Sequence, residues 1–128
     1  MAANSNGTVL VRREDAGEVM QLALMECEEG AFILCRTEGE QTLEAYDSPW
    51  HVGGVFVGEG NLAALRQMLA GPLGNPNVPL ADLLRTAFAT PRVQFSDLLD
   101  LLDVASIPYE YRAFAPNKAL FRPSTPAA

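Results

Sequence analysis

The only histidine of the chain, His51, follows its only tryptophan, Trp50, in the segment SPWHVGGVFVG at residues 48–58. Histidine exchanges protons near neutral pH, which makes His51 the first candidate for a catalytic or ligand-binding group. In a regular strand, neighbouring side chains point to opposite faces, so the sheet separates these two residues unless Gly53–Gly54 form a bulge. We therefore interpret the segment as a strand with an aromatic anchor, and not as an active site.

Motifs for covalent catalysis and nucleotide binding do not match this sequence. No serine stands in a G-x-S-x-G segment, and a single histidine would have to serve any catalytic triad. The glycine-rich segment GGVFVGEG has neither the dinucleotide-binding spacing nor the lysine of a phosphate-binding loop. We therefore predict that the chain is not an enzyme, that it has no catalytic residue and that it needs no cofactor.

Two groups of residues could in principle bind a metal ion. Two cysteines and one histidine at the spacing found here match no zinc pattern. The segment DLLDLLD repeats aspartate at every third position, which could bring carboxylates together on one side of a helix. An acidic, solvated helix face explains the repeat more simply, because no oxygen-rich loop accompanies it. No metal is predicted at Asp97, Asp100 and Asp103.

The two cysteines, Cys27 and Cys35, flank the segment EEGAFIL. A hairpin turn at Glu29–Gly30 would place Cys27 across from Phe32 and Cys35 across from Leu24, on opposite faces of the sheet. A disulfide between them is therefore not expected. We predict two reduced and mostly buried thiols, as in a cytoplasmic protein, and the N-terminal segment MAANSNGT has no secretory signal pattern.

Length and charge restrict the class of protein further. The 128 residues correspond to a single domain, and no apolar run approaches the length that spans a membrane. Sixteen acidic residues against nine basic ones give a net charge of −7. Duplex nucleic acid is therefore not an expected partner, because phosphate binding needs a basic surface.

Hydrophobic periodicity predicts an α+β domain with an N-terminal antiparallel β-meander of four to five strands, three helices and a short C-terminal β-hairpin. Strand-like segments occupy residues 8–13, 19–27, 31–37, 42–46 and 51–58. The period then changes to that of helices, expected at residues 61–70, 79–89 and 96–106, with Asn61 and Ser96 as N-caps. The hairpin is expected at residues 109–121, before a frayed tail at 122–128.

The segments VMQLALM and VGGVFV are apolar on both faces, although an antiparallel sheet with one solvated face alternates more cleanly. Three short helices cover one face at most, so we expect a second copy of the chain to cover the other, giving a homodimer. The alternative is a sheet that curls into a partial barrel. Candidate interface or ligand-binding residues are Met20, Met25, Phe32, Tyr46, Trp50, His51 and Phe56.

Two functions follow from these features. The first is a non-catalytic, acidic interaction module, a cytoplasmic homodimer that binds or regulates a protein partner. The second is a single-stranded nucleic-acid-binding domain, because four strands followed by a helix over residues 19–70 resemble the layout of Whirly and Pur-type domains. That resemblance covers under half of the chain and implies binding on the sheet. Its contacts would be Arg12, Arg13 and Arg36 with the aromatic side chains Phe32, Tyr46, Trp50 and Phe56.

A third hypothesis is a small-molecule pocket between the sheet and the helices. It would have Trp50, His51 and Tyr46 at its mouth.

Overall fold

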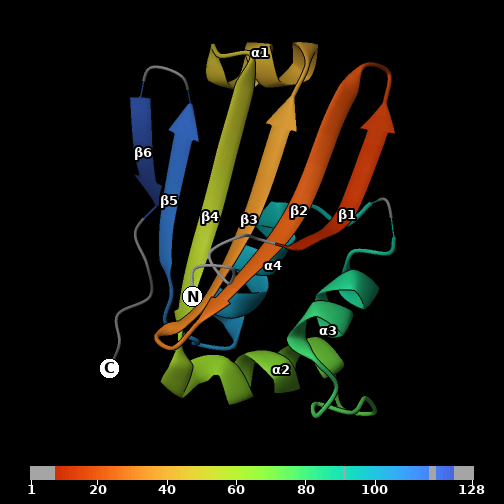
Figure 1. Ribbon diagram of the computed structural model, residues 1–128, viewed down its shortest axis with the longest axis vertical. Helices are drawn as coiled ribbons and strands as arrows, with labels where there is room; N and C mark the ends of the chain where they lie inside the picture. Colours follow the sequence, from red (N-terminus) through yellow and green to blue (C-terminus); the bar gives the residue numbers. More distant parts are fainter. Residues whose placement is uncertain (1–7, 91, 116–117, 123–128) are drawn as a thin grey trace.

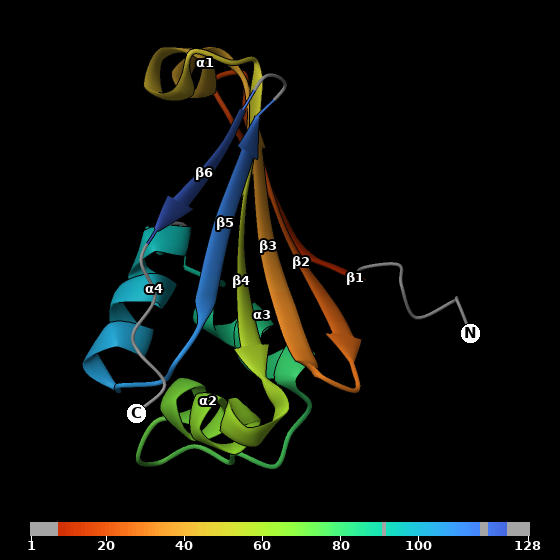
Figure 2. The same ribbon diagram turned by 90° about the vertical axis from the view of Figure 1, so that its left-hand side faces the viewer.

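The computed structural model describes residues 8–90, 92–115 and 118–122, which form one six-stranded antiparallel sheet with helices on one face (Figures 1 and 2). The strand order in the sheet is the order along the chain, so each strand pairs with the next. The strands are β1 (Thr8–Asp15), β2 (Glu18–Cys27), β3 (Gly30–Glu38), β4 (Trp50–Gly58), β5 (Glu110–Ala115) and β6 (Lys118–Arg122).

The helices interrupt the meander at two places. One short helix, α1, joins β3 to β4, and three further helices with a 3₁₀ turn lie between β4 and β5. Their bounds are α1 (Glu40–Tyr46), the 3₁₀ turn η2 (Glu59–Asn61), α2 (Leu62–Ala70), α3 (Leu80–Ala87) and α4 (Phe95–Val104). The predicted α+β class is confirmed, and none of the described helices is long and apolar enough to cross a membrane.

The predicted strand at residues 42–46 is wrong, because this segment forms most of helix α1. The segment EQTLEAY consists mainly of good helix formers, and only Thr42 is buried. The chain enters the helix through Gly39, whose φ of 137° is accessible to glycine at little cost. A Cβ at this position would also collide with Glu18 and with the Gly17 carbonyl oxygen.

The predicted helix caps also need correction. Asn61 occupies the N-cap position of α2, but its side chain makes no capping hydrogen bond. Ser96 is not the cap of α4, because the helix begins at Phe95 and Gln94 is its N-cap. The backbone N–H of Gln94 donates to Asp97 Oδ2 at 2.8 Å, so the first aspartate of DLLDLLD takes part in capping the N-terminus of α4.

The tail predicted at 122–128 falls mostly outside the described residues. Its first residue, Arg122, is the last residue of β6.

The core lies between one face of the sheet, here called the inner face, and helices α2, α3 and α4 (Figure 2). Alternate residues of β2, β3 and β4 point to this face, and Leu22, Ile33 and Val55 among them are completely buried. The opposite face, here called the open face, carries the intervening residues of the same strands and is not covered by any described helix (Figures 1 and 2). The sheet does not close into a barrel, since β1 and β6 are its two edges.

The two cysteines are free and lie on opposite faces, as predicted, but the predicted register is wrong. Cys27 pairs with Gly30 and Cys35 pairs with Leu22, because the turn lies at residues 28–29. This register differs from the predicted one by two residues, and a shift of two keeps every side chain on its face. Cys35 is buried, whereas Cys27 is exposed, so the prediction of two mostly buried thiols is wrong for Cys27.

Candidate functional site

His51 lies on the inner face of β4 beneath helix α1, and its side chain is almost fully buried, at 5% exposure. The ring of Tyr46 stacks on it, with centroids 3.6 Å apart and planes 9° from parallel. Trp50 points to the open face, where the guanidinium carbon of Arg36 lies 5.3 Å from its ring centroid. The hypothesis of a mouth shared by all three residues is therefore wrong for Trp50, because adjacent strand residues face opposite sides.

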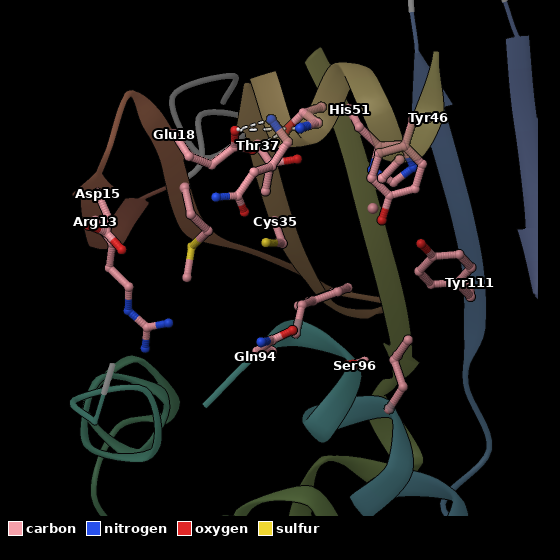
Figure 3. A pocket seen from close by; sticks show the side chains of 17 residues that line it. Arg13, Asp15, Glu18, Cys35, Thr37, Tyr46, His51, Gln94, Ser96 and Tyr111 are labelled. Atoms are coloured by element: carbon pink, nitrogen blue, oxygen red, sulfur yellow. Dashed lines mark hydrogen bonds between the residues drawn. The ribbon is translucent and has the colours of Figure 1, made fainter. Parts of the chain in front are cut away.

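Tyr46 and His51 form one wall of a cavity of about 590 Å³ (Figure 3). Helix α1 lies above the cavity, the inner face of the sheet forms its back, and the first turn of α4 lies below (Figure 3). Cys35 and Gly53 line the sheet side, and Gln94 and Ser96 line the α4 side. The cavity is therefore space between α1, the sheet and the start of α4 that the core side chains do not fill.

A carboxylate on strand β2 holds helix α1 in place. Glu18 on β2 accepts hydrogen bonds from the backbone N–H groups of Gln41 at 3.1 Å and Thr42 at 3.4 Å. It also accepts one from the Thr42 hydroxyl. These are the bonds that a side chain at an N-cap normally makes, so Glu18 caps α1 from outside the helix. Sequence reasoning missed Glu18 because it assigned its partner segment to a strand.

The other end of the cavity is bounded by Arg13 of β1, which fastens the α3–α4 connection to the sheet. Its guanidinium donates to the carbonyl oxygens of Phe88 at 2.6 Å, Thr90 at 2.9 Å and Val93 at 2.7 Å. Phe88 is the C-cap of α3, where carbonyl groups lack partners within the helix. The positive charge of Arg13 is thus engaged in holding the fold together.

Burial shifts the pKa of two titratable groups of the cavity away from their charged forms. Burial lowers the pKa of His51 from its usual value, which favours the neutral imidazole. Burial raises the pKa of the Cys35 thiol to about 12, although the nearby positive charge of Arg13 opposes this effect. A thiol with that pKa is not a nucleophile at neutral pH. Nor does any group of His, Cys, Asp and Glu side chains among the described residues suit a metal ion.

The open face of the sheet carries aromatic and aliphatic side chains in rows across the strands. Met25, Phe32 and Phe56 stand opposite one another on β2, β3 and β4, and the two phenylalanine rings are 4.7 Å apart. In the next row Ala23 pairs with Leu34. Phe32 is 37% exposed and Phe56 is half-buried, so this face presents apolar surface to its surroundings.

Each described arginine of the open face forms a salt bridge with a glutamate two positions away on its own strand. The N···O distances are 2.7 Å for Arg12–Glu14, 3.1 Å for Arg36–Glu38 and 3.9 Å for Arg112–Glu110. The formal charge of these six residues is zero, whereas the whole chain carries −7.

The predicted site residues are therefore divided between two surfaces. Met25, Phe32, Trp50, Phe56, Arg12 and Arg36 belong to the open face, whereas Met20, Tyr46, His51 and Arg13 line the cavity. The cavity also includes Tyr111, which the sequence did not single out. Its hydroxyl lies over Gly53, where a Cβ would approach it to 2.8 Å.

These features define an α+β domain with a one-sided helix layer, one cavity beneath α1 and one uncovered sheet face. No protein-family model matches the chain, and no curated protein or solved structure is similar enough to count as a match.

Proposed function

We propose that this chain is a non-catalytic interaction module that works as a homodimer, with the open face of the sheet as the shared interface. The observation that carries the proposal is the one-sided helix layer. It leaves Phe32, Phe56 and their apolar neighbours on a face that no described helix covers. Contiguous apolar surface of this kind usually marks an interaction site on a protein.

The size of the open face fits such an interface. Strands β2, β3 and β4 contain 10, 9 and 9 residues, so the sheet is about 30 Å long at about 3.3 Å per residue. The six strands, spaced about 4.8 Å apart, give a width of about 24 Å, hence roughly 700 Å² of projected area. A typical stable interface buries about 800 Å² of accessible surface per partner, and accessible area exceeds projected area.

The charge pattern favours a second copy of the chain as the occupant. Two copies with a net charge of −7 repel each other, but the charged residues of the open face sum to zero. A two-fold axis brings the same face of both copies together, so Arg36 of one copy can approach Glu38 or Glu14 of the other. Equal numbers of arginine and glutamate make the face complementary to itself.

The proposed dimer leaves an acidic surface for a protein partner, because the whole net charge lies outside the open face. The free thiols of Cys27 and Cys35 support the cytoplasm as its compartment. The raised pKa of Cys35 supports a non-catalytic role for this thiol, since the nucleophilic thiolate does not form at neutral pH.

Single-stranded nucleic acid is the second candidate occupant of the same face. It is favoured by the presence of Arg12, Arg36, Trp50, Phe32 and Phe56 together on the open face. The salt bridges to Glu14 and Glu38 weigh against it, because a paired arginine adds little net attraction for phosphate. We therefore place the dimer first.

Light scattering behind size exclusion tests the proposal at micromolar concentration. The wild type should elute with twice the 13.8 kDa mass of the chain, and Phe32→Glu combined with Phe56→Glu should elute as a monomer. The matched control is Val104→Glu on α4, which also adds charge to an exposed apolar residue but should remain dimeric. If the wild type is a monomer and binds a fluorescent oligo-dT strand, the homodimer proposal is wrong and the single-stranded nucleic-acid function takes its place.

A further inference from the structure

Helix α1 lies at one end of the sheet, away from α2 and α3, and few contacts attach it (Figures 1 and 2). Of its seven residues only Thr42 is buried, and Glu18 of β2 caps its N-terminus. Its last residue, Tyr46, stacks on His51 of β4 with ring centroids 3.6 Å apart. A segment with so little buried surface opens at a lower free energy than the core, so α1 can leave the sheet while the rest stays folded.

The place of His51 beneath α1 suits a neutral ring better than a protonated one. The side chain is 5% exposed, and its Nε2 is inaccessible to solvent and has no hydrogen-bond partner. In an imidazolium both ring nitrogens carry a proton, so each needs an acceptor or water. The face of Tyr46 attracts a cation, but this attraction replaces only part of the hydration that a buried, unpaired charge loses.

The carboxylates nearest to His51 are not placed to neutralise an imidazolium. Those that line the same cavity are Asp15 and Glu18. Asp15 lies three strands away from β4, or about 14 Å at a spacing of about 4.8 Å, and Glu18 lies two strands away and accepts hydrogen bonds from α1. If Glu18 turned toward a protonated His51, the helix would lose its cap, so this rearrangement would also release α1.

The remaining groups around His51 supply no negative charge either. The α4 side of the cavity is lined by uncharged residues, and Thr37 stands opposite His51 on β3. The acidic side chains of α1 and its C-cap, Glu40, Glu44 and Asp47, are exposed. The other titratable side chains that line the cavity are a guanidinium, a thiol and two phenols: Arg13 of β1, Cys35 of β3, Tyr46 of α1 and Tyr111 of β5.

Burial lowers the pKa of His51, so the covered ring takes up a proton less readily than a solvated one. Protonation and exposure of the ring therefore favour each other. The ring lies between the paired strands of the sheet and α1, and α1 is the less firmly attached of the two. Gly39 and Asp47 flank the helix at positive φ, and rotation at these two positions would move it while β3 and β4 stay paired.

We infer that α1 is a pH-sensitive lid: a proton on His51 releases Tyr46 and the helix from the sheet and uncovers the cavity of about 590 Å³ beneath them. The lid is closed at neutral pH and opens more often as the medium becomes acidic.

Amide hydrogen exchange measures the opening of the lid. The backbone N–H groups of Leu43 and Asp47 donate within the α1 segment, to Gly39 and Leu43 at 3.0 and 2.8 Å. A ring that titrates at about pH 6.5 only when released raises the opening equilibrium by about tenfold between about pH 7.5 and about pH 5.5. The protection factors of these two amides should therefore fall by about three- to tenfold, the smaller value applying if the covered ring is partly protonated at the lower pH.

Two other helix ends are internal controls in the same spectra. The N–H groups of Gly71 after α2 and Ala105 after α4 donate to Gln67 and Leu101 at 3.0 and 2.9 Å. These ends can open without exposing His51, so their protection factors should not change between the two pH values. An equal fall at Gly71 and Ala105 would overturn the proposal, because it would show a general effect of acid on helix ends.

Two variants assign the effect to His51. His51→Gln stays uncharged at both pH values, so its Leu43 and Asp47 amides should keep the same protection. Glu18→Gln removes the nearby carboxylate and should retain the fall in protection if His51 takes up the proton. Protection of α1 in the wild type that does not change with pH, or a fall that persists in His51→Gln or disappears in Glu18→Gln, would overturn the proposal. If His51→Gln does not fold, the wild-type comparison of α1 with Gly71 and Ala105 decides the question.

Discussion

Arg13 joins strand β1 to the end of helix α3, and its loss should destabilise the whole fold. Its guanidinium donates to the carbonyl oxygens of Phe88, Thr90 and Val93 at 2.6, 2.9 and 2.7 Å. Two of these bonds are partly buried, and the third is exposed. Phe88 is the C-cap of α3, where a positive charge also interacts favourably with the helix dipole.

The magnitude follows from these contacts. A hydrogen bond that involves a charged group contributes about 1.5–3 kcal/mol, but three bonds from one guanidinium share one desolvation cost and do not add. We expect Arg13→Met to lower the free energy of unfolding by about 2–4 kcal/mol. For a domain of this size each kcal/mol corresponds to about 3–5 °C, so Tm should fall by roughly 6–20 °C.

Urea unfolding followed by the fluorescence of Trp50 measures this effect, because the chain has a single tryptophan. Arg85→Met is the matched control, since Arg85 forms an exposed pair with Asp82 at 3.0 Å. The control should cost no more than about 0.5 kcal/mol. If both variants lost the same stability, the contacts of Arg13 would not hold the α3–α4 connection as we infer.

Three further predictions concern single residues. Burial lowers the pKa of His51, so its contribution to stability is present above the unfolded pKa of about 6.5 and declines as the pH falls below it. The urea midpoint of the wild type should therefore fall more between about pH 7.5 and about pH 5.5 than that of His51→Gln. An equal fall in both proteins would contradict this. Alkylation of the native protein at mildly alkaline pH should modify Cys27 but not Cys35, whose pKa is raised to about 12, whereas denatured protein should show both adducts by mass spectrometry. Glu18→Ala should cost about 1–2 kcal/mol through the lost cap of α1, and Glu18→Gln should cost less; equal losses in thermal unfolding would exclude a capping role.

Much of the fold could be predicted because its strands and helices are encoded locally. Alternation along residues 50–58 separates Trp50 from His51, and the structure places them on opposite faces. Helix α1 could not be predicted with the same means, because its cap comes from Glu18, which is 24 positions before Thr42. The pattern of TLEAY, taken alone, fits a short strand as well as a helix.

The cavity was predicted only in part, for a related reason. Tyr46 and His51 were expected beside a pocket, but its other walls come from β1, β5 and the first turn of α4, which meet only in the folded chain. Ser96 illustrates the difficulty, since its type and position suggested a helix cap, whereas it lines the cavity one residue inside α4. Local sequence patterns do not indicate which distant elements will lie side by side in the folded chain.

Isotope-filtered nuclear Overhauser spectroscopy on a mixture of labelled and unlabelled chains tests the open-face dimer most directly, because it detects only contacts between two copies. The account predicts contacts between copies from the rings of Phe32 and Phe56 and from the methyl groups of Leu34 and Ala23. Each of these lies on the open face. Contacts between copies that arise only from Leu101 and Val104 on α4, or no such contacts at all at millimolar concentration, would contradict the proposed dimer.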